Sequence, residues 1–293
     1  MMFDNAHLDL HIGKKIRPSK SLYALEDLEK YFIEKCVNTG IKYSHDVTAK
    51  ENPYFKTLNY TTYAGMFIMH PLEFNLSLHQ MYDAKADNLD ALSHVEVIKN
   101  RLCSGDGSKY VRIDGEEKKV ASGKFKYVIC LPGSNKFYDH VSKKKFVSIC
   151  KTHGSDVVVK PHPITNQKVL DEVKLFAGNA FVADKDDDLY SYIENCEKVY
   201  TTHISESALT SVVLGKSIEP VEKYSAKFTG SFSHINHFCF TESNPIDVVG
   251  KIFASPKSGV VHPIADADWK NKIDLYFEYI MAKRLMYFGS YLE

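Results

Sequence analysis

The sequence predicts an α/β protein of two domains, and three observations favour this fold class. From residue 125 onward, short apolar runs alternate with helical patterns of about ten residues, which is typical of βαβ units in a parallel, doubly wound sheet. Residues 104–123 are rich in glycine, serine and charged residues, as expected of a segment that joins domains. A chain of 293 residues is also long for a single hydrophobic core.

The first part of the chain predicts both strands and helices. Residues 6–12 alternate between polar and apolar side chains, as a half-buried strand does. An apolar stripe at helical spacing, with Ser19 or Ser21 as N-cap and Gly40 near its end, predicts a helix over residues 21–37. We then expect a strand over 63–69, helices over 72–82 and 89–102, and a hairpin strand over 110–113 that turns at Asp114-Gly115.

The remaining sequence predicts a regular alternation of strands and helices. The strands are short and apolar, and they cover residues 125–131, 157–160, 181–183, 199–202 and 217–221. The helices between them cover residues 137–153, 166–176, 186–195 and 205–214, and a final helix covers residues 265–284. We therefore expect a first domain of residues 1–122, a second domain of residues 123–264 and a C-terminal helical segment of residues 265–293.

The composition of the chain indicates which partners it has, whether its cysteines are oxidised and whether it enters a membrane. Lysine plus arginine and aspartate plus glutamate number 37 each, so no global charge drives the chain onto nucleic acid or an anionic membrane. The six cysteines show no C-x-x-C spacing, which favours reduced, buried thiols. The N-terminus is too polar for a signal peptide, and no apolar run approaches the ~20 residues that span a bilayer. We expect a cytoplasmic protein, or one in a host cytoplasm, without stable membrane insertion.

The first candidate binding motif is Lys160-Pro161-His162-Pro163, which follows the β-branched strand at residues 157–160. Ligands of open parallel sheets bind beyond the carboxyl ends of the strands. The two prolines keep this loop out of helical conformations, so His162 is placed to donate to a phosphate oxygen and Lys160 adds a positive charge. The alternative is a structural loop in which His162 caps a neighbouring helix. A similar pair, His262-Pro263, has no strand-to-helix context in the sequence, and we interpret it as structural.

The second candidate motif is Ser205-Glu206-Ser207, at the start of the helix that follows the strand over residues 199–202. Ser205 is a good N-cap, and Ser207 together with the first N–H groups of the helix would face an anion. Glu206 could accept hydrogen bonds from ribose hydroxyls, as acidic residues at such strand ends do. The alternative is an ordinary N-cap followed by surface residues.

Together, these motifs resemble the C-terminal half of GT-B glycosyltransferases, and in particular the group of capsule Kdo transferases and bacterial polysialyltransferases. That group carries a Lys/Arg-x-His-Pro segment, a serine-rich helix start and a small-residue helix ending in Gly-Lys-Pro; Ser217 stands here in place of that proline. The resemblance covers roughly residues 124–224 and does not extend to the N-terminal third.

The resemblance implies two Rossmann-like domains facing across a cleft, with the C-terminal helix crossing back to an N-terminal acceptor domain. It implies a nucleotide-sugar donor, UDP- or CMP-linked, bound as substrate without a further cofactor or metal. His162 and Ser205 or Ser207 would bind its phosphates, and the charge of Lys160 would help to neutralise them. His203 or Glu206 would bind its nucleoside end.

An inverting glycosyltransferase also needs a general base for the acceptor hydroxyl, usually a carboxylate or histidine. The candidates in the first domain are Asp9, His11, His70 and Glu73. The alternative interpretation for each of these four residues is a purely structural role. The His234-x-x-His237-x-Cys239 pattern lacks a fourth ligand at zinc-site spacing, so we expect no metal, and we interpret residues 231–240 as a loop near the donor.

The acceptor has two candidate classes. The short chain, rich in Lys, Asp, Tyr and Asn, also resembles phage-encoded proteins, some of which glycosylate hydroxymethylcytosine in duplex DNA with GT-B enzymes. Lys14, Lys15 and Arg17 would then contact the phosphate backbone. The alternative acceptor is a bacterial surface or capsular glycan. Two functions of other classes stay open: a non-catalytic nucleotide-binding α/β module and a sugar-nucleotide epimerase.

Overall fold

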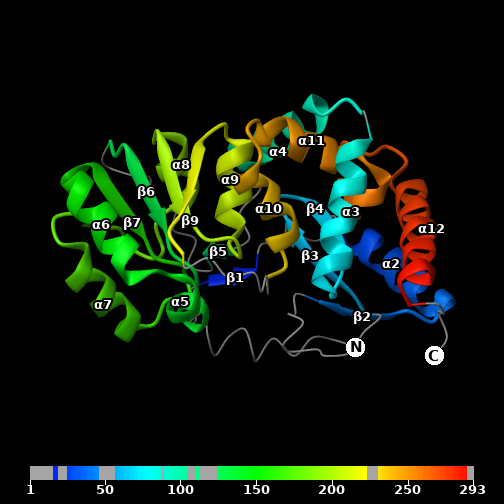
Figure 1. Ribbon diagram of the computed structural model, residues 1–293, viewed down its shortest axis with the longest axis horizontal. Coiled ribbons are helices and arrows are strands. Elements are labelled where there is room, and N and C mark those ends of the chain that lie inside the picture. Colours follow the sequence, from blue (N-terminus) through cyan, green and yellow to red (C-terminus); the bar gives the residue numbers. More distant parts are fainter. Residues whose placement is uncertain are drawn as a thin grey trace. The chain divides into compact units, whose positions relative to one another are not determined.

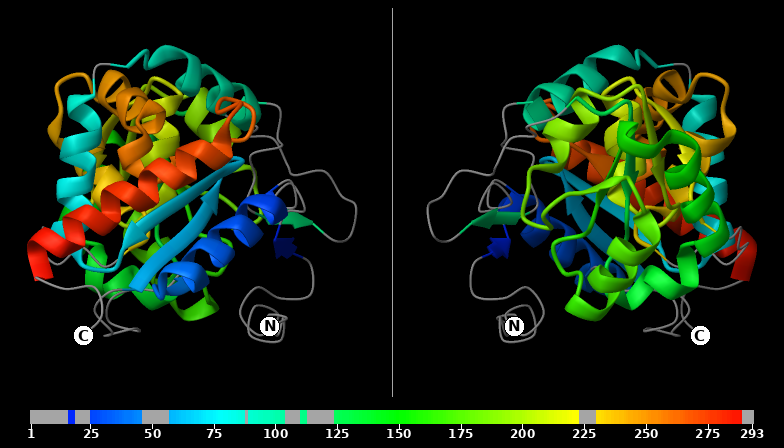
Figure 2. Two further views of the ribbon diagram at one scale, coloured as in Figure 1. Left: turned by 90° about the vertical axis from the view of Figure 1, so that its right-hand side faces the viewer. Right: turned by 90° about the vertical axis from the view of Figure 1, so that its left-hand side faces the viewer.

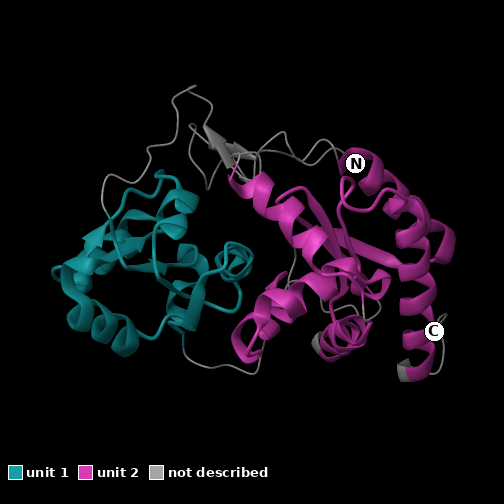
Figure 3. Ribbon diagram, turned by 90° about the horizontal axis from the view of Figure 1, so that it is seen from above, with its two compact units in different colours: residues 1–19, 108–226 teal, residues 20–107, 227–293 magenta. Residues whose placement is uncertain are grey.

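The computed structural model (Figure 1) describes residues 16–18, 25–45, 57–87, 89–103, 110–112, 124–222 and 230–288. The chain divides into two compact units, each treated by itself below: unit 1 is Met1–Ser19 with Ser108–Ala226, and unit 2 is Lys20–Gly107 with Lys227–Glu293 (Figure 3). Each unit has its own larger sheet with helices around it, so the predicted α/β class is confirmed.

The sheet of unit 1 is parallel throughout, as the alternating pattern predicted. Its strands are β6 (Tyr127–Cys130), β7 (Val157–Lys160), β8 (Phe181–Val182), β9 (Lys198–Thr201) and β10 (Ser217–Pro220). They lie in the order β10-β9-β6-β7-β8. The chain therefore runs outward from β6 to one edge and then returns to build the other, which is the doubly wound topology with its switch point between β6 and β9.

Helices bury both faces of this sheet. They are α5 (Ser134–His140), α6 (Lys143–His153), the 3₁₀ turn η2 (Gly154–Asp156), α7 (Gln167–Ala177), α8 (Leu189–Glu194) and α9 (Glu206–Val213). Ile129, Val157 and Val159 face a core formed with α6 and α7. The alternate residues Val128 and Val158 face a second core formed with α8. Because successive strand residues point to opposite faces, two covered faces require a continuous apolar run.

The predicted helix over residues 137–153 is wrong, because it is two helices. α5 ends at His140, and Val141 forms an antiparallel bridge with Glu222. Ser142 then caps α6 by accepting a hydrogen bond from the N–H of Lys145. A contact between two segments that are far apart in sequence thus interrupts a locally favourable helical pattern.

The sheet of unit 2 is mixed, which departs from the expected second Rossmann-like domain. It contains β2 (Lys42–His45), β3 (Thr57–Tyr63), β4 (Met66–Pro71) and β11 (Val260–Val261), in the order β11-β4-β3-β2. Only β2 and β3 are parallel; the other two pairings are antiparallel. The strand predicted over residues 63–69 is instead a hairpin, since Ala64 (φ 49°) and Gly65 (φ 80°) form the tight turn between β3 and β4.

Two helices of unit 2 cover one face of this sheet, as Figure 2 shows in blue and red: α2 (Glu26–Thr39) and α12 (Trp269–Phe288). Phe32 of α2, Phe67 of β4 and Tyr276 of α12 are fully buried in the core between them. Gly259 is required beside this core. Its φ is +69°, and a Cβ there would lie 2.2 Å from the carbonyl oxygen of Met69.

The remaining helices of unit 2 are α3 (Phe74–Ala86), α4 (Leu92–Cys103), α10 (Ser233–Thr241), α11 (Pro245–Ala254) and the 3₁₀ turn η3 (Pro256–Ser258). α10 and α11 pack against α3 and α4. Residues 230–264 therefore belong to unit 2 and not to the second domain in which we placed them. The expected loop over residues 231–240 is largely helix α10, because Ile235, Phe238 and Cys239 are buried in that unit.

β1 (Ile16–Pro18) pairs antiparallel with β5 (Tyr110–Arg112). We predicted β5 as one strand of a local hairpin, but its partner is β1, which lies near the start of the sequence. Asp114-Gly115, the predicted turn, lies outside the described residues.

Candidate functional site

Three loops meet at the carboxyl edge of the parallel sheet of unit 1. They follow β6, β7 and β9 and cover residues 131–133, 161–166 and 202–205. β6 lies between the other two strands, so these loops flank the topological switch point. Sheets of this class bind ligands at this place, because diverging crossover connections leave a crevice there.

The loops after β6 and β7 are bound directly to each other. The N–H of Leu131 donates to the carbonyl of Lys160 at 3.1 Å, and the N–H of Asn166 donates to Ser134 Oγ at 2.7 Å. Gly133 allows this approach, since a Cβ there would lie 2.7 Å from Ile164 Cδ1. The position of the His162 loop is therefore set by the β6 loop.

Lys160 is buried, and its Nζ donates to the carbonyls of Pro161 at 3.0 Å and Lys185 at 2.8 Å. Burial lowers the pKa of Lys160 to about 8, although Asp187 and other nearby carboxylates oppose that change. Lys160 thus joins two loops of unit 1 through its ammonium group. This geometry gives it a structural role beside the phosphate-binding role expected from the sequence.

His162 is held in one orientation by its own loop. Its Nδ1 accepts a hydrogen bond from the N–H of Ile164 at 3.2 Å, and its carbonyl accepts from the N–H of Thr165 at 2.8 Å. Because Nδ1 is an acceptor, the neutral imidazole carries its proton on Nε2. The loop therefore presents an N–H donor, the group that a phosphate oxygen needs.

The N-terminus of α9 is capped by the predicted serine. Ser205 Oγ accepts from the N–H of Ser207 at 3.2 Å. The hydroxyl of Ser207 lies 2.7 Å from that of Ser205 and 2.5 Å from that of Thr201, and Ser207 is only 1% exposed. Ser207 therefore positions Ser205, whereas Ser205 and Glu206 are partly exposed at the helix start. Thr202 Oγ1 is buried at the same place without a hydrogen-bond partner among the described residues.

Sequence reasoning missed the partner of His203. Glu222 accepts a hydrogen bond from the backbone N–H of His203 at 2.8 Å and forms an ion pair with its Nδ1. The other carboxylate oxygen of Glu222 lies 3.8 Å from Nδ1 of His140. Burial, and then the charge of Lys136, lower the pKa of His140. The only sequence signal for Glu222 was its position just after the last strand of the sheet.

Most of the residues expected to bind the acceptor or act as base fall outside the described part of the chain. Asp9, His11, Lys14 and Lys15 all lie there. Arg17 is in β1, where it pairs with Val111 of β5 through the backbone. His70 and Glu73, the other two candidate bases, belong to unit 2.

His70 lies at the end of β4 with both ring nitrogens engaged. Nδ1 donates to the carbonyl of Pro71 at 2.9 Å, so Nε2 is the acceptor for the amide of Asn59 at 3.0 Å. Its ring packs against that of His234, with 4.4 Å between the centroids and an interplanar angle of 33°. A base at this position would have to give up the Asn59 hydrogen bond first.

His234 comes from α10 and is almost completely buried, and burial followed by the neighbouring His70 lowers its pKa well below the usual value. Its Nε2 has no hydrogen-bond partner among the described residues. Glu73 precedes α3, with its carboxylate 4.0 Å from Arg284 of α12. Unit 2 thus buries His70 against His234 and pairs Glu73 with Arg284, and sequence reasoning had found only His70 and Glu73 among these four residues.

Over the described ranges, no group of three or more histidine, cysteine or acidic side chains could hold a metal ion. No described helix is both long and apolar enough to cross a bilayer. All six cysteines are free thiols, and only Cys103 is exposed.

Comparison with known proteins adds no assignment to this geometry. The chain matches no protein-family model, and it matches no curated protein sequence.

Proposed function

We propose that the protein is a nucleotide-sugar-dependent glycosyltransferase of the GT-B type and that unit 1 binds the donor. The observation that carries this proposal is the pair of anion-binding groups on either side of β6. His162 offers an Nε2–H donor after β7, and α9 offers its N-terminal amides and Ser205 after β9. Two strand spacings separate them, about 10 Å, which a diphosphate and its ribose can span.

These groups suit the chemistry of sugar transfer. As the glycosidic bond to the donor breaks, negative charge develops on the departing phosphate. An imidazole N–H and helix N-terminal amides that are already oriented stabilise that charge without reorganising. In this proposal His162 and Ser205 contact the phosphates. Lys160 and Ser207 do not contact them but hold the loops that carry His162 and Ser205 in position.

The nucleoside end is assigned to His203 and Glu206. Glu222 fixes the imidazole of His203 through Nδ1, so the ring is presented in a defined orientation at the end of β9. Glu206 lies in the first turn of α9 and could accept from the ribose hydroxyls. The general base is sought among Asp9, His11, His70 and Glu73, and Lys14, Lys15 and Arg17 are assigned to the acceptor.

The test begins with the donor. The full chain is incubated with UDP-, CMP-, CDP- and GDP-linked sugars, and both thermal stabilisation and release of free sugar are measured. A donor at a free concentration of 100 times its dissociation constant should raise the free energy of unfolding by about 2.7 kcal/mol. Turnover of one donor to free sugar supports the transferase. Binding without turnover would favour a nucleotide-binding module, and formation of an epimer would favour an epimerase.

The acceptor is tested in a second step with the same labelled donor. The arms are duplex DNA containing hydroxymethylcytosine, unmodified duplex and an oligosaccharide. We expect label on the hydroxymethylated duplex, with binding that weakens steeply as salt rises, because neutralised phosphates release counterions. Label on the oligosaccharide alone would replace DNA by a surface glycan as the acceptor.

A further inference from the structure

The charges of unit 1 are segregated along the chain. Residues 124–177 contain ten lysines and four acidic residues, whereas residues 178–222 contain three lysines and nine acidic residues. The balanced net charge of the whole chain therefore hides a basic region and an acidic region within this unit, and a basic region attracts anions locally whatever the net charge is.

The segregation follows the two faces of the parallel sheet. α6 and α7 pack on the face lined by Ile129, Val157 and Val159, and six lysines lie on these two helices. They are Lys143, Lys144, Lys145 and Lys151 of α6 and Lys168 and Lys174 of α7, and all but the half-buried Lys145 are exposed. We call this surface the lysine face. α8 covers the other face of the sheet, and it is preceded by Asp184, Asp186, Asp187 and Asp188.

Within the described part of the chain, no carboxylate pairs with a lysine of the lysine face. The ion pairs of unit 1 use other lysines, Lys126 with Asp156 and Lys198 with Glu219. Lys143 Nζ lies 3.6 Å from the ring centroid of Phe176, which joins α6 to α7 but does not neutralise the charge. The acidic residues of α7, Asp171 and Glu172, accept from Gln167 and Tyr138 instead.

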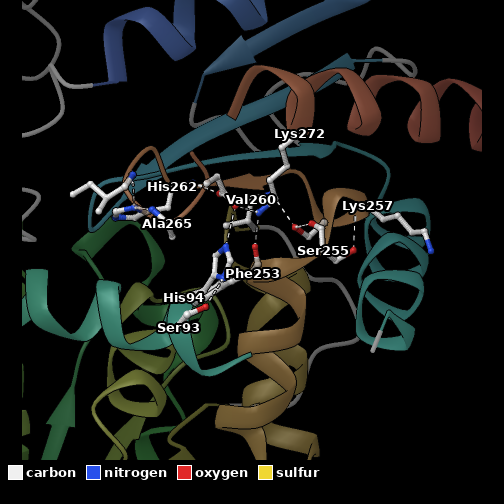
Figure 4. Close-up of polar contacts among 12 residues, drawn as sticks. Ser93, His94, Phe253, Ser255, Lys257, Val260, His262, Ala265 and Lys272 are labelled. Carbon is white, nitrogen blue, oxygen red and sulfur yellow. Dashed lines mark hydrogen bonds and ion pairs between the residues drawn. The ribbon is translucent and has the colours of Figure 1, made fainter. Parts of the chain in front are cut away.

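The acidic region of unit 1, in contrast, is used to build the fold. Asp188 caps α8 by accepting the N–H of Ser191 at 2.9 Å, and Asp187 accepts from the hydroxyl of Tyr192 at 3.0 Å. Buried lysines are used in the same way in unit 2, where Lys272 Nζ donates to the carbonyl of Phe253 at 2.7 Å (Figure 4). The lysine face is thus left with positive charge that the fold itself does not use. A second copy of this chain is a poor partner for it, because these carboxylates are already engaged.

The start of α6 adds to the excess of positive charge. Lys143, Lys144 and Lys145 occupy its first turn, which contains no acidic residue. Cations are unfavourable at this end of a helix, because the macrodipole is positive there. A bound anion would offset this repulsion, and a polymer of anions would also reach the lysines further along α6 and α7.

We propose that the lysine face of unit 1 binds the phosphate backbone of duplex nucleic acid. Lys143 and Lys151 are eight residues apart, about 12 Å along the axis of α6, and duplex DNA carries about seven phosphates over that length. Lysine ammonium groups contact phosphates as point charges, so binding at this face does not depend on base sequence. The proposal goes beyond sugar transfer and does not require that activity.

The test measures the affinity of the full chain for a short, labelled, unmodified DNA duplex by fluorescence anisotropy, between about 50 and 200 mM salt. We expect a dissociation constant on the order of 10⁻⁴–10⁻⁶ M near physiological salt, and an affinity that falls steeply as salt rises. The variant Lys143→Gln, Lys144→Gln, Lys145→Gln removes three phosphate contacts. The factor by which its affinity falls over this range of salt should be about 40-fold smaller than for the natural chain, since each contact contributes about 0.9 to the slope.

The matched control is the variant Lys30→Gln, Lys99→Gln, Lys270→Gln, which changes the net charge by the same amount on unit 2. It should keep the salt dependence of the natural chain. Thermal unfolding shows that both variants are folded, as expected for substitutions of exposed or half-buried lysines. The proposal is wrong if the duplex does not bind at the lowest salt, or if the two variants weaken binding equally. Binding to anionic lipid vesicles without binding to the duplex would likewise overturn it in favour of a membrane surface.

Discussion

The two larger sheets of this protein place their polar residues differently. In unit 1 the strands are apolar on both faces, and polar side chains with binding potential gather beyond the carboxyl ends of β6, β7 and β9. In unit 2 one face of β3 and β4 is apolar, whereas Asn59, Thr61 and His70 are buried on the other. A parallel sheet covered by helices has room for chemistry only at its edge. A mixed sheet with one apolar core can bury polar groups along a whole face, where each needs a partner.

The largest expected effect concerns the apolar face of unit 2. Phe67→Ala removes a fully buried ring from the core between α2 and α12. We expect the free energy of unfolding to fall by about 3–5 kcal/mol, measured by urea denaturation, because the cavity can collapse only in part. A loss below about 1 kcal/mol would mean that this face is not the core of the unit.

The next effect tests the carboxyl edge of unit 1. His162→Ala should lower the rate of sugar transfer by about 10²–10³-fold with the fold intact, since it removes one donor to the departing phosphate. His153→Ala is the matched control, because His153 ends α6 and its ring packs against Tyr127 at the start of β6, at the opposite end of that strand. Equal rates of sugar transfer in the two variants would show that the carboxyl edge of this sheet takes no part in the reaction.

The polar face of unit 2 should respond more weakly than its apolar face. Asn59→Ala takes away the amide that donates to His70 Nε2. We expect a loss of about 1–3 kcal/mol in the free energy of unfolding, because a buried acceptor loses its donor. Thr62→Ala, on the same strand but half-buried, should change stability by less than about 0.5 kcal/mol. If Asn59→Ala matched this control, the polar face would carry no hydrogen-bond requirement.

A smaller effect separates helix capping from binding. Ser205→Ala and Ser142→Ala each remove an N-cap, of α9 and α6 respectively, at a cost of about 1 kcal/mol in stability. Only Ser205 lies at the proposed donor site, so only Ser205→Ala should also weaken the affinity for the nucleotide sugar in a calorimetric titration. Equal affinity for the nucleotide sugar in both variants would show that Ser205 caps α9 and does not contact the donor.

The smallest effect is a pH dependence at the edge of unit 1. Burial lowers the pKa of His140 in the folded state, so below pH 6.5 the unfolded chain takes up its proton more readily than the folded one. The contribution of neutral His140 to the free energy of unfolding is therefore fully present above pH 6.5, and it declines as the pH falls. His140→Gln should give a flatter stability profile between about pH 7 and 5 than the natural chain. Identical slopes would exclude His140 as a titrating group.

The elements predicted best are those whose signals are local. The parallel strands of unit 1 were found because burial on both faces demands runs such as Val157, Val158 and Val159. Helix ends were found where a cap lies beside the helix in sequence, as Ser205 does for α9 and Gly40 for α2. The β3–β4 hairpin was missed because its turn is Ala64-Gly65, which lacks the usual asparagine or aspartate. Its geometry is imposed by the pairing of the two strands.

By itself, the sequence determined the α/β class, the parallel sheet, and His162 and Ser205 as candidate ligands, because each depends on residues close together in the chain. Only the tertiary structure decided that α5 and α6 separate at Val141, that residues 230–264 join unit 2, and that Glu222 holds His203. It alone revealed the buried nitrogens of His234 and His262. Whether a polar atom has a partner depends on segments far apart in sequence, and the local pattern around a histidine is the same with that partner or without it.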